Sequence, residues 1–319
     1  MLRAAFAPHL LAFFLFSALF FAGVEALAQA APANVTTNTT AAPDDTPPHL
    51  RELLDKSGKG DPDAQVALAE AYITAYKYPD LAKTLGAKAP EDLFGTVEKL
   101  CRAAAEKGPQ GLTCLGDLFA VQKKAEALDW YLKAADRGNV HAMVRLGDAY
   151  RLGAVGTVDL NAADNWYRRA AGTGSVEGER ALGMALWRPH GDLAEAELWL
   201  RKAADQGDTP AECTLGSFVA REKHDAAGGF AWYMKAAEQG DTSGQSEVGI
   251  LYAAGVGVEK NPVEAYFWLT LALLNGDVNG PRDVQQRTAA AAKLDETQLA
   301  AVQKRLKEWK PTPAAPEKK

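Results

Sequence analysis

The chain has 319 residues, a formal net charge of −6 at pH 7 and 24% charged residues. An acidic chain of this kind lacks the clustered basic surface that marks nucleic-acid-binding proteins, so no nucleic-acid partner is expected. The length would suit two ordinary domains, but internal repeats reduce the expectation to one elongated domain with a tail at each end.

Residues 1–30 have the pattern of a secretory signal peptide. One cation, Arg3, precedes an apolar stretch over residues 10–24, and the A-L-A-Q-A sequence that follows offers cleavage after Ala28 or Ala30. A helix over the apolar stretch would span about 22 Å, which is short of a hydrocarbon core of about 30 Å. A periplasmic or secreted protein is therefore expected, with no transmembrane segment in the mature chain; an uncleaved membrane anchor is the alternative.

A disordered linker is expected over residues 31–48, because this stretch is rich in alanine, proline, threonine and asparagine and has almost no large apolar side chain. The folded domain is expected to follow over residues 49–277, where the sequence becomes repetitive.

Two columns of residues recur through this region at intervals of 31 to 36 residues, which is typical of a solenoid. One column is a tryptophan that stands eight residues before a glycine: Trp130, Trp166, Trp199, Trp232 and Trp268. The other is a glycine preceded by leucine or valine: Gly116, Gly147, Gly183, Gly216 and Gly249.

Each repeat is predicted to be a pair of short helices. Residues 140–152 and 161–171, for example, both carry apolar side chains at helical spacing. Helices of about a dozen residues are marginal alone in water, so they are expected to pair as hairpins and stack. The recurring glycine suggests a closely packed neighbouring helix, and the glycine after each tryptophan suits a helix C-terminus with positive φ. Each tryptophan is expected to be buried.

The combination L-G, G-x-G-V, A-x-x-W and A-A-x-x-G resembles the Sel1-like repeat (SLR) family, a relative of the tetratricopeptide repeats. Residues 242–277 fit the pattern best. The resemblance implies an all-α fold, an α-solenoid of about six helix-turn-helix repeats that forms an SLR/TPR-like superhelix. The expected units are residues 61–108, which are degenerate, and then 109–139, 140–175, 176–208, 209–241 and 242–277.

Two C-terminal capping helices are expected over residues 278–309, and they should close the apolar end of the last repeat. Asp295 followed by Gln298 predicts a capping box at the start of the second of them. The proline-containing segment 310–319 is expected to be a disordered tail.

Three cysteines are present, so an exported chain must keep at least one unpaired. Cys101 and Cys114 flank the predicted turn at Gly108 almost symmetrically, which makes a disulfide possible; a plain buried thiol at Cys101 is the alternative. Cys213 has no accompanying histidine motif and is not expected to be a nucleophile.

No other residues form a recognisable catalytic or metal-binding pattern. The histidines are isolated, and neither zinc-ligand spacing nor the motifs of serine hydrolases or β-lactamases occur. We therefore expect no catalytic residue, no metal and no cofactor, and a non-enzymatic protein.

The SLR resemblance also implies that the first helix of each unit lines a concave groove. Positions about one turn from the L-G column give the candidate partner-binding residues Asp117, His141, Asp148, Arg151, Arg180, Trp187, Arg188 and Arg221. Arginine and tryptophan often anchor protein interfaces, which favours a binding surface. The alternative is that these residues form ordinary solvated helix faces.

The function expected from these observations is a protein-interaction scaffold or regulator of the cell envelope. The family resemblance implies partners such as a membrane sensor, or components of polysaccharide or secretion machinery that the protein helps to assemble. A hydrolase acting on cell-wall or β-lactam-type molecules is the third and weakest reading.

Overall fold

The computed structural model describes residues 48–77, 90–154, 157–276 and 280–312. These residues form helices and connecting turns without any strand, which confirms the predicted all-α class. None of the described helices is long and apolar enough to cross a membrane. The predicted signal peptide over residues 1–30, residues 31–47 of the predicted linker and residues 313–319 of the predicted tail lie outside the described residues.

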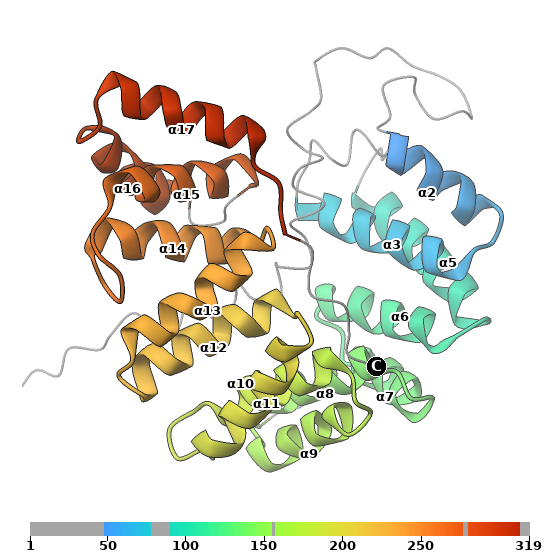
Figure 1. The fold of residues 1–319 in the computed structure, drawn as a ribbon. Helices are drawn as coiled ribbons and strands as arrows, with labels where there is room; N and C mark the ends of the chain where they lie inside the picture. Colours follow the sequence, from blue (N-terminus) through green and yellow to red (C-terminus); the bar gives the residue numbers. More distant parts are fainter. Residues whose placement is uncertain (1–47, 78–89, 155–156, 277–279, 313–319) are drawn as a thin grey trace, which may run out of the picture. The chain divides into compact units, whose positions relative to one another are not determined.

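The chain divides into two compact units, Met1–Trp130 and Tyr131–Lys319, with the division falling inside helix α7, Ala127–Asp136 (Figure 1). The first unit contains the helices α2 (Pro48–Gly58), α3 (Pro62–Lys77), α5 (Pro90–Ala105) and α6 (Pro109–Val121). Helices α3 and α5 form a hairpin, α6 packs against α5, and α2 packs against α3. The helix α2 precedes the first expected repeat and was not predicted as a separate element.

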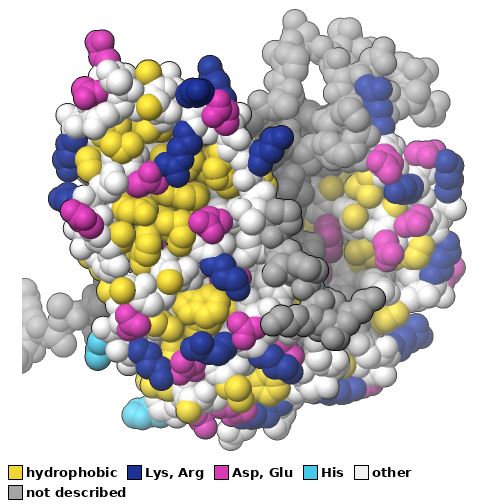
Figure 2. Space-filling model, viewed as in Figure 1, with side chains coloured by type: hydrophobic (Ala, Val, Ile, Leu, Met, Phe, Trp, Pro, Cys, Tyr) yellow, Lys and Arg dark blue, Asp and Glu magenta, His cyan; other side chains and the backbone are white. Residues whose placement is uncertain are grey.

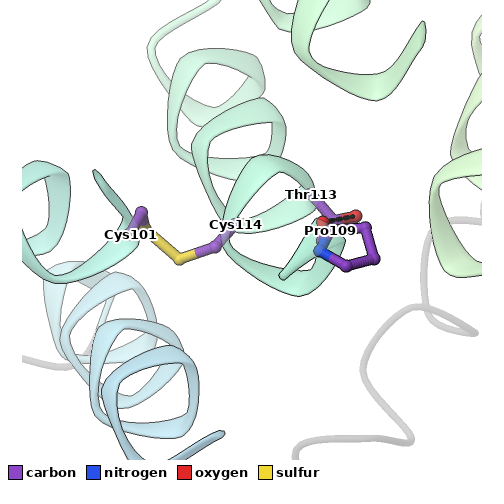
Figure 3. The surroundings of a disulfide bond; sticks show 4 residues. All are labelled: Cys101, Pro109, Thr113 and Cys114. Atoms are coloured by element: carbon purple, nitrogen blue, oxygen red, sulfur yellow. Dashed lines mark hydrogen bonds between the residues drawn. A yellow bond between two sulfur atoms is a disulfide. The ribbon is translucent and has the colours of Figure 1, made fainter. Parts of the chain in front are cut away.

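A disulfide links two helices of the first unit. Cys101 of α5 and Cys114 of α6 are bonded, with their Cα atoms 5.4 Å apart (Figure 3). Next to Cys114, the Thr113 hydroxyl donates to the Pro109 carbonyl one turn earlier in α6, at 3.2 Å. Both cysteines lie in a core that includes Leu115. The predicted pairing of Cys101 with Cys114 is therefore present in the structure.

The second unit contains four successive hairpins. They are α8 with α9 (Val140–Arg151, Leu160–Ala171), α10 with α11 (Val176–Leu186, Leu193–Asp205), α12 with α13 (Thr209–Glu222, Ala226–Glu238) and α14 with α15 (Thr242–Ala254, Pro262–Leu274). The helices α16 (Gly280–Ala291) and α17 (Glu296–Glu308) follow (Figure 1). Each of the four hairpins lies within one of the expected units 140–175, 176–208, 209–241 and 242–277.

Local sequence signals explain where these helices begin and end. Seven of the eight hairpin helices have an N-cap Asp or Asn whose side chain accepts a hydrogen bond from the first turn: Asn139, Asp159, Asp192, Asp208, Asp225, Asp241 and Asn261. The predicted closing glycines all have positive φ, from 79° at Gly174 to 97° at Gly240. The backbone can therefore leave each second helix without steric strain.

The glycine of the L-G column marks a close helix contact, as predicted. A Cβ atom at Gly147 would lie 2.6 Å from the Tyr167 ring, and one at Gly249 would lie 2.6 Å from Leu269 Cγ. A side chain at this column would push the two helices of a hairpin apart.

The prediction of a buried tryptophan in every unit is wrong for four of the five. Trp130, Trp166, Trp199 and Trp232 are only partly buried, and Trp268 alone is in the core, 4% exposed. The core position is the next residue along the helix, filled by Tyr131, Tyr167, Leu200, Tyr233 and Leu269. The spacing of the tryptophans located the helix correctly, but the indoles lie at the margin of the core.

Cations cover these partly exposed indoles. Three of them carry the side chain from three residues later over the ring: Arg169 on Trp166, Lys202 on Trp199 and Lys235 on Trp232, 4.9–5.1 Å from the centroids. Neighbours three apart lie on one helix face, so this arrangement follows from the sequence spacing.

The C-terminal helices form as predicted, including the capping box in which Asp295 and Gln298 exchange hydrogen bonds at the start of α17. Helix α16 packs against α15 and α14, whereas α17 packs against α15. The beginning of the predicted disordered tail is held on the protein, because the Thr312 amide donates to the Glu238 carbonyl at 2.7 Å.

Candidate partner-binding surface

We term the shared surface of the first helices of the second unit, α8, α10, α12 and α14, the A-helix face. All candidate residues except Asp117 lie on or directly after α8, α10 and α12. The starts of these helices are linked from one repeat to the next. His141 Nδ1 lies 2.6 Å from Glu177 Oε1, and Arg180 Nε lies 3.2 Å from Asp208 Oδ2. His141 and Arg180, predicted as groove residues, therefore bind within the chain.

The electrostatics of these links differ. Burial would raise the pKa of the Glu177 carboxyl, but the hydrogen bond and charge of His141, with nearby arginines, hold it below its usual value. Burial raises the pKa of Asp208, and the opposing effect of Arg180 does not cancel the rise. Both carboxyls thus have a structural role at the junction between repeats.

Cys213 occupies the next junction, where its side chain is buried. Its thiol lies 3.4 Å from Asp241 Oδ1 and is 6% exposed, and the Thr209 hydroxyl donates to the other oxygen of the same carboxyl. Burial raises the pKa of the Cys213 thiol well above its usual value, and the Asp241 carboxylate raises it further. The hydrolase reading therefore finds no support at this residue.

Asp148 and Arg151 form a network with the core tyrosine of their own hairpin. The Tyr167 hydroxyl donates to Asp148 Oδ1 at 2.7 Å, and Arg151 contacts both of these side chains. Burial raises the pKa of Tyr167, and the carboxylate of Asp148 raises it further. These two predicted groove residues therefore hold α8 against α9.

Arg188 has a similar role, because it binds the Asp164 carboxylate through both terminal nitrogens, at 2.7 and 2.9 Å. Of the remaining candidates, Asp117 lies in the first unit, on α6, and is partly buried. Charged positions predicted to face a partner are thus largely engaged within the chain.

Trp187 and Arg221 are the exception. The guanidinium of Arg221 lies 5.5 Å from the Trp187 ring centroid, the ring packs edge-on against Phe218, and the indole N–H donates to Glu222 at 2.9 Å. Arg221 and Glu222 are exposed, and Trp187 is only partly buried. The structure therefore brings together an aromatic ring, a cation and an anion at the C-terminal ends of α10 and α12.

A repeated buried clamp was missed from the sequence. Glu212 is fully buried and binds Lys235 Nζ and Gln239 Nε2, each at 2.7 Å. Glu179 is bound in the same way by Lys202 and Gln206. The sequence contains a signal for this clamp. The glutamate stands four residues before the glycine of the L-G column, and the lysine and glutamine stand three and seven residues after the repeat tryptophan.

The last hairpin has a neutral version of this clamp. Gln245 replaces the acid and accepts from Asn275 at 3.1 Å, and Leu271 stands where the lysine would be. Around it, hydrophobic surface gathers over α13, α14 and α15 (Figure 2). Partly buried apolar residues of these helices include Phe230, Tyr252 and Tyr266.

The described residues contain no group of three or more histidine, cysteine or acidic side chains placed to hold a metal. The chemistry available on the A-helix face is that of recognition: aromatic surface, cations and hydrogen-bonding carboxylates.

Comparison with known proteins identifies the repeats. The Sel1 repeat family matches residues 115–139, 140–174, 180–208, 216–241 and 242–277. Protein sel-1 homolog 2 of Rattus norvegicus is 31% identical over 87 residues, a match that covers 26% of this chain and only 13% of that relative. No enzyme family was detected.

Solved bacterial structures share the architecture. The protective antigen c5321 of uropathogenic Escherichia coli, described as displaying an SLR fold, is 26% identical with a TM-score of 0.54 over 84% of this chain and 60% of that one. A Sel1 repeat protein from Oxalobacter formigenes has the same fold at 24% identity and a TM-score of 0.51, covering 78% of this chain and 98% of that one. Proteins built from such repeats generally mediate protein–protein interactions and are usually non-catalytic. The repeat columns, the hairpins they form and these matches together show that the chain belongs to the Sel1-like repeat family.

Proposed function

We propose that this protein is a non-enzymatic scaffold or regulator of the cell envelope that binds a protein partner on the A-helix face, centred on Trp187 and Arg221. The observation that supports this centre is the exposed Arg221 stacked on a partly exposed indole whose N–H is already held by Glu222. A ring fixed in this way loses little conformational freedom on binding, and tryptophan and arginine are frequent anchors of interfaces.

Export to the periplasm or beyond is part of the proposal. The Cys101–Cys114 disulfide supports it, because structural disulfides persist in oxidising compartments and are rare in the cytosol. The signal-peptide pattern of residues 1–30 is the second support.

Site-specific crosslinking in intact cells tests the docking surface. A photo-crosslinking amino acid at Lys223, an exposed residue beside Arg221 that leaves the Arg221 side chain in place, should capture a defined envelope protein, whereas the same group at Leu198, which is 62% exposed on α11, should not. Equal capture from both positions, or capture from Leu198 alone, would contradict the assignment. A sensor among the captured proteins would identify a regulator, and polysaccharide or secretion components would identify an assembly scaffold.

Two arginines then separate binding from stability. Arg221→Ala should weaken capture by about tenfold while leaving the melting temperature unchanged, since Arg221 is exposed. Arg180→Ala should instead lower the melting temperature, because the Asp208 carboxyl, 18% exposed, would lose its partner. If Arg221→Ala also destabilised the fold without changing capture, the Trp187 cluster would be structural only.

A further inference from the structure

Helix α15 is apolar on nearly all sides. Its sequence, PVEAYFWLTLALL, buries Phe267, Trp268, Leu269 and Leu271 together with smaller residues. A helix that is hydrophobic all round must be covered all round. Helices α14 and α16 pack against it, and α17 provides a further layer of cover.

The cover by α17 explains why Trp268 differs from the other repeat tryptophans. Trp166, Trp199 and Trp232 each carry a cation from three residues later, but the residue three after Trp268 is Leu271. At this hairpin the apolar cover and the cation both come from α17. Val302 joins the core cluster of Trp268, and Arg305 lies 3.7 Å from the Phe267 ring centroid.

The contact between α17 and α15 is also complementary in charge. Arg305 binds the Glu264 carboxylate at 2.5 Å, at the first turn of α15. Beyond the helix, Trp309 packs on the same cluster and Pro311 lies against Gly240, where a Cβ atom would be 3.3 Å from the Pro311 ring. Together these contacts define a groove for a helix with apolar residues on one stripe and an arginine beside it.

Helix α17 buries few of its own side chains in this groove. Val302 is the only side chain of α17 that is fully buried, whereas Leu306 and Trp309 are partly buried and Arg305 is exposed. An exposed ion pair contributes little to stability. A strongly apolar groove is thus closed by a helix that has few anchors of its own.

The clamps of the other hairpins indicate where Arg305 could bind if α17 left the groove. Lys202 and Lys235 are the tenth residues of α11 and α13, and each binds a buried acid at the fourth position of its preceding helix, Glu179 or Glu212. In the last helix pair, these positions hold Arg305 on α17 and Asp283 on α16. Asp283 is fully buried, and neither of its carboxylate oxygens has a hydrogen-bond partner among the described residues.

We propose that the α15 groove is a docking site for an amphipathic partner helix that carries apolar residues in the spacing of Val302, Leu306 and Trp309 and an arginine in place of Arg305. Helix α17 occupies this site within the chain and is displaced when the partner helix binds. The displaced helix can fold back on α16, as the other hairpins do, which brings Arg305 to the unpaired Asp283. This site is separate from the A-helix face and does not depend on it.

Exchange of a peptide against α17 in the full-length protein tests the proposal. The probe is a fluorescent peptide of residues 295–312, and its binding is measured by anisotropy. A chain with Val302→Asp should bind the probe at least about tenfold more tightly than the wild-type chain, because its own α17 no longer competes. The matched control Gln303→Asp, at an exposed position of the same helix, should bind like wild type. Equal binding by the Val302→Asp and wild-type chains would overturn the proposal.

Charge specificity is read from a second probe in which Arg305 is replaced by glutamine. It should bind the Val302→Asp chain several-fold more weakly than the first probe, and adding Glu264→Gln to the chain should abolish this difference. If both probes bind alike, the groove does not select an arginine. Should Val302→Asp disturb the whole fold, as seen by circular dichroism, Arg305→Gln in the chain replaces it and should tighten binding of the first probe by about threefold.

Asp283→Asn tests the second position of α17. This change should weaken probe binding by the otherwise wild-type chain, because the displaced helix loses its alternative partner. Unchanged or tighter probe binding would show that α17 has no second binding position on α16.

Discussion

The two units of this protein stabilise similar helix pairs by different means. In the first unit, the Cys101–Cys114 disulfide ties α5 to α6. In the second unit no disulfide occurs among the described residues, and the hairpins are held by elements that recur at fixed repeat positions, such as the buried Glu212 with Lys235 and Gln239. Where the repeat pattern is degenerate, a covalent bond replaces the contacts that the regular repeats supply.

The largest effect is expected where the second unit depends most on burial. Trp268→Ala should lower the free energy of unfolding of this unit by about 3–5 kcal/mol, since the indole is 4% exposed. Trp199→Ala should cost about 1–2 kcal/mol because that ring is only partly buried. Urea denaturation monitored by hydrogen exchange would measure the stability of each unit separately. Similar losses of stability in the Trp268→Ala and Trp199→Ala variants would contradict the difference in burial between the two indoles.

Removing the disulfide should break the first unit alone. Cys101→Ala with Cys114→Ala opens a link between residues 13 apart and should cost about 3 kcal/mol. Amide exchange in α5 and α6 should accelerate, while α12 and α13 keep wild-type protection. Faster exchange throughout the second unit would show that its clamps do not suffice to hold it.

The clamp of the second unit can be converted into the version found in its last hairpin. Lys235→Met alone should cost about 2 kcal/mol, because it leaves the fully buried Glu212 with one partner fewer. Adding Glu212→Gln, which copies the neutral Gln245 arrangement, should recover most of that loss. Thermal denaturation at pH 7 measures both, and an additive loss in the double variant would show that the two residues are not coupled.

The smallest effect is a dependence on pH at the junction of α8 and α10. The folded pKa of Glu177 is lowered, so its contribution is present above the unfolded value near 4.5 and is lost as the pH falls through the folded value. Since both partners are more than a third exposed, the loss between pH 5 and pH 3 should stay below about 1 kcal/mol. As the pH falls, the free energy of unfolding of the wild-type protein should decrease by this amount relative to that of the Glu177→Gln variant. Free energies that change in parallel with pH would contradict a stabilising role for the Glu177 carboxylate.

Much of the fold could be predicted, because the repeats specify helix, turn and close contact at each position. The glycine columns, the caps and the capping box at Asp295 all behave as local chemistry requires. The exposure of the tryptophans could not be derived, since spacing shows which face of a helix a residue occupies and not how deep it lies. The ion pairs of the candidate groove residues could not be derived for a related reason: Arg180 and Arg188 have carboxylate partners distant in sequence. The particular side chains through which α17 contacts α15 depend on tertiary packing that no local signal encodes.

Asp241 shows how such an array can change its length. The carboxylate that starts α14 also receives Thr209 and Cys213 from α12, just as Asp208 starts α12 and receives Arg180 from α10. The modules that begin with α10 and α12 therefore each carry an acceptor for the preceding module and a donor for the following one. A tandem duplication of one such module supplies both the donor and the acceptor of the new contact between the two copies. The array can therefore gain a module without any further substitution at the junction.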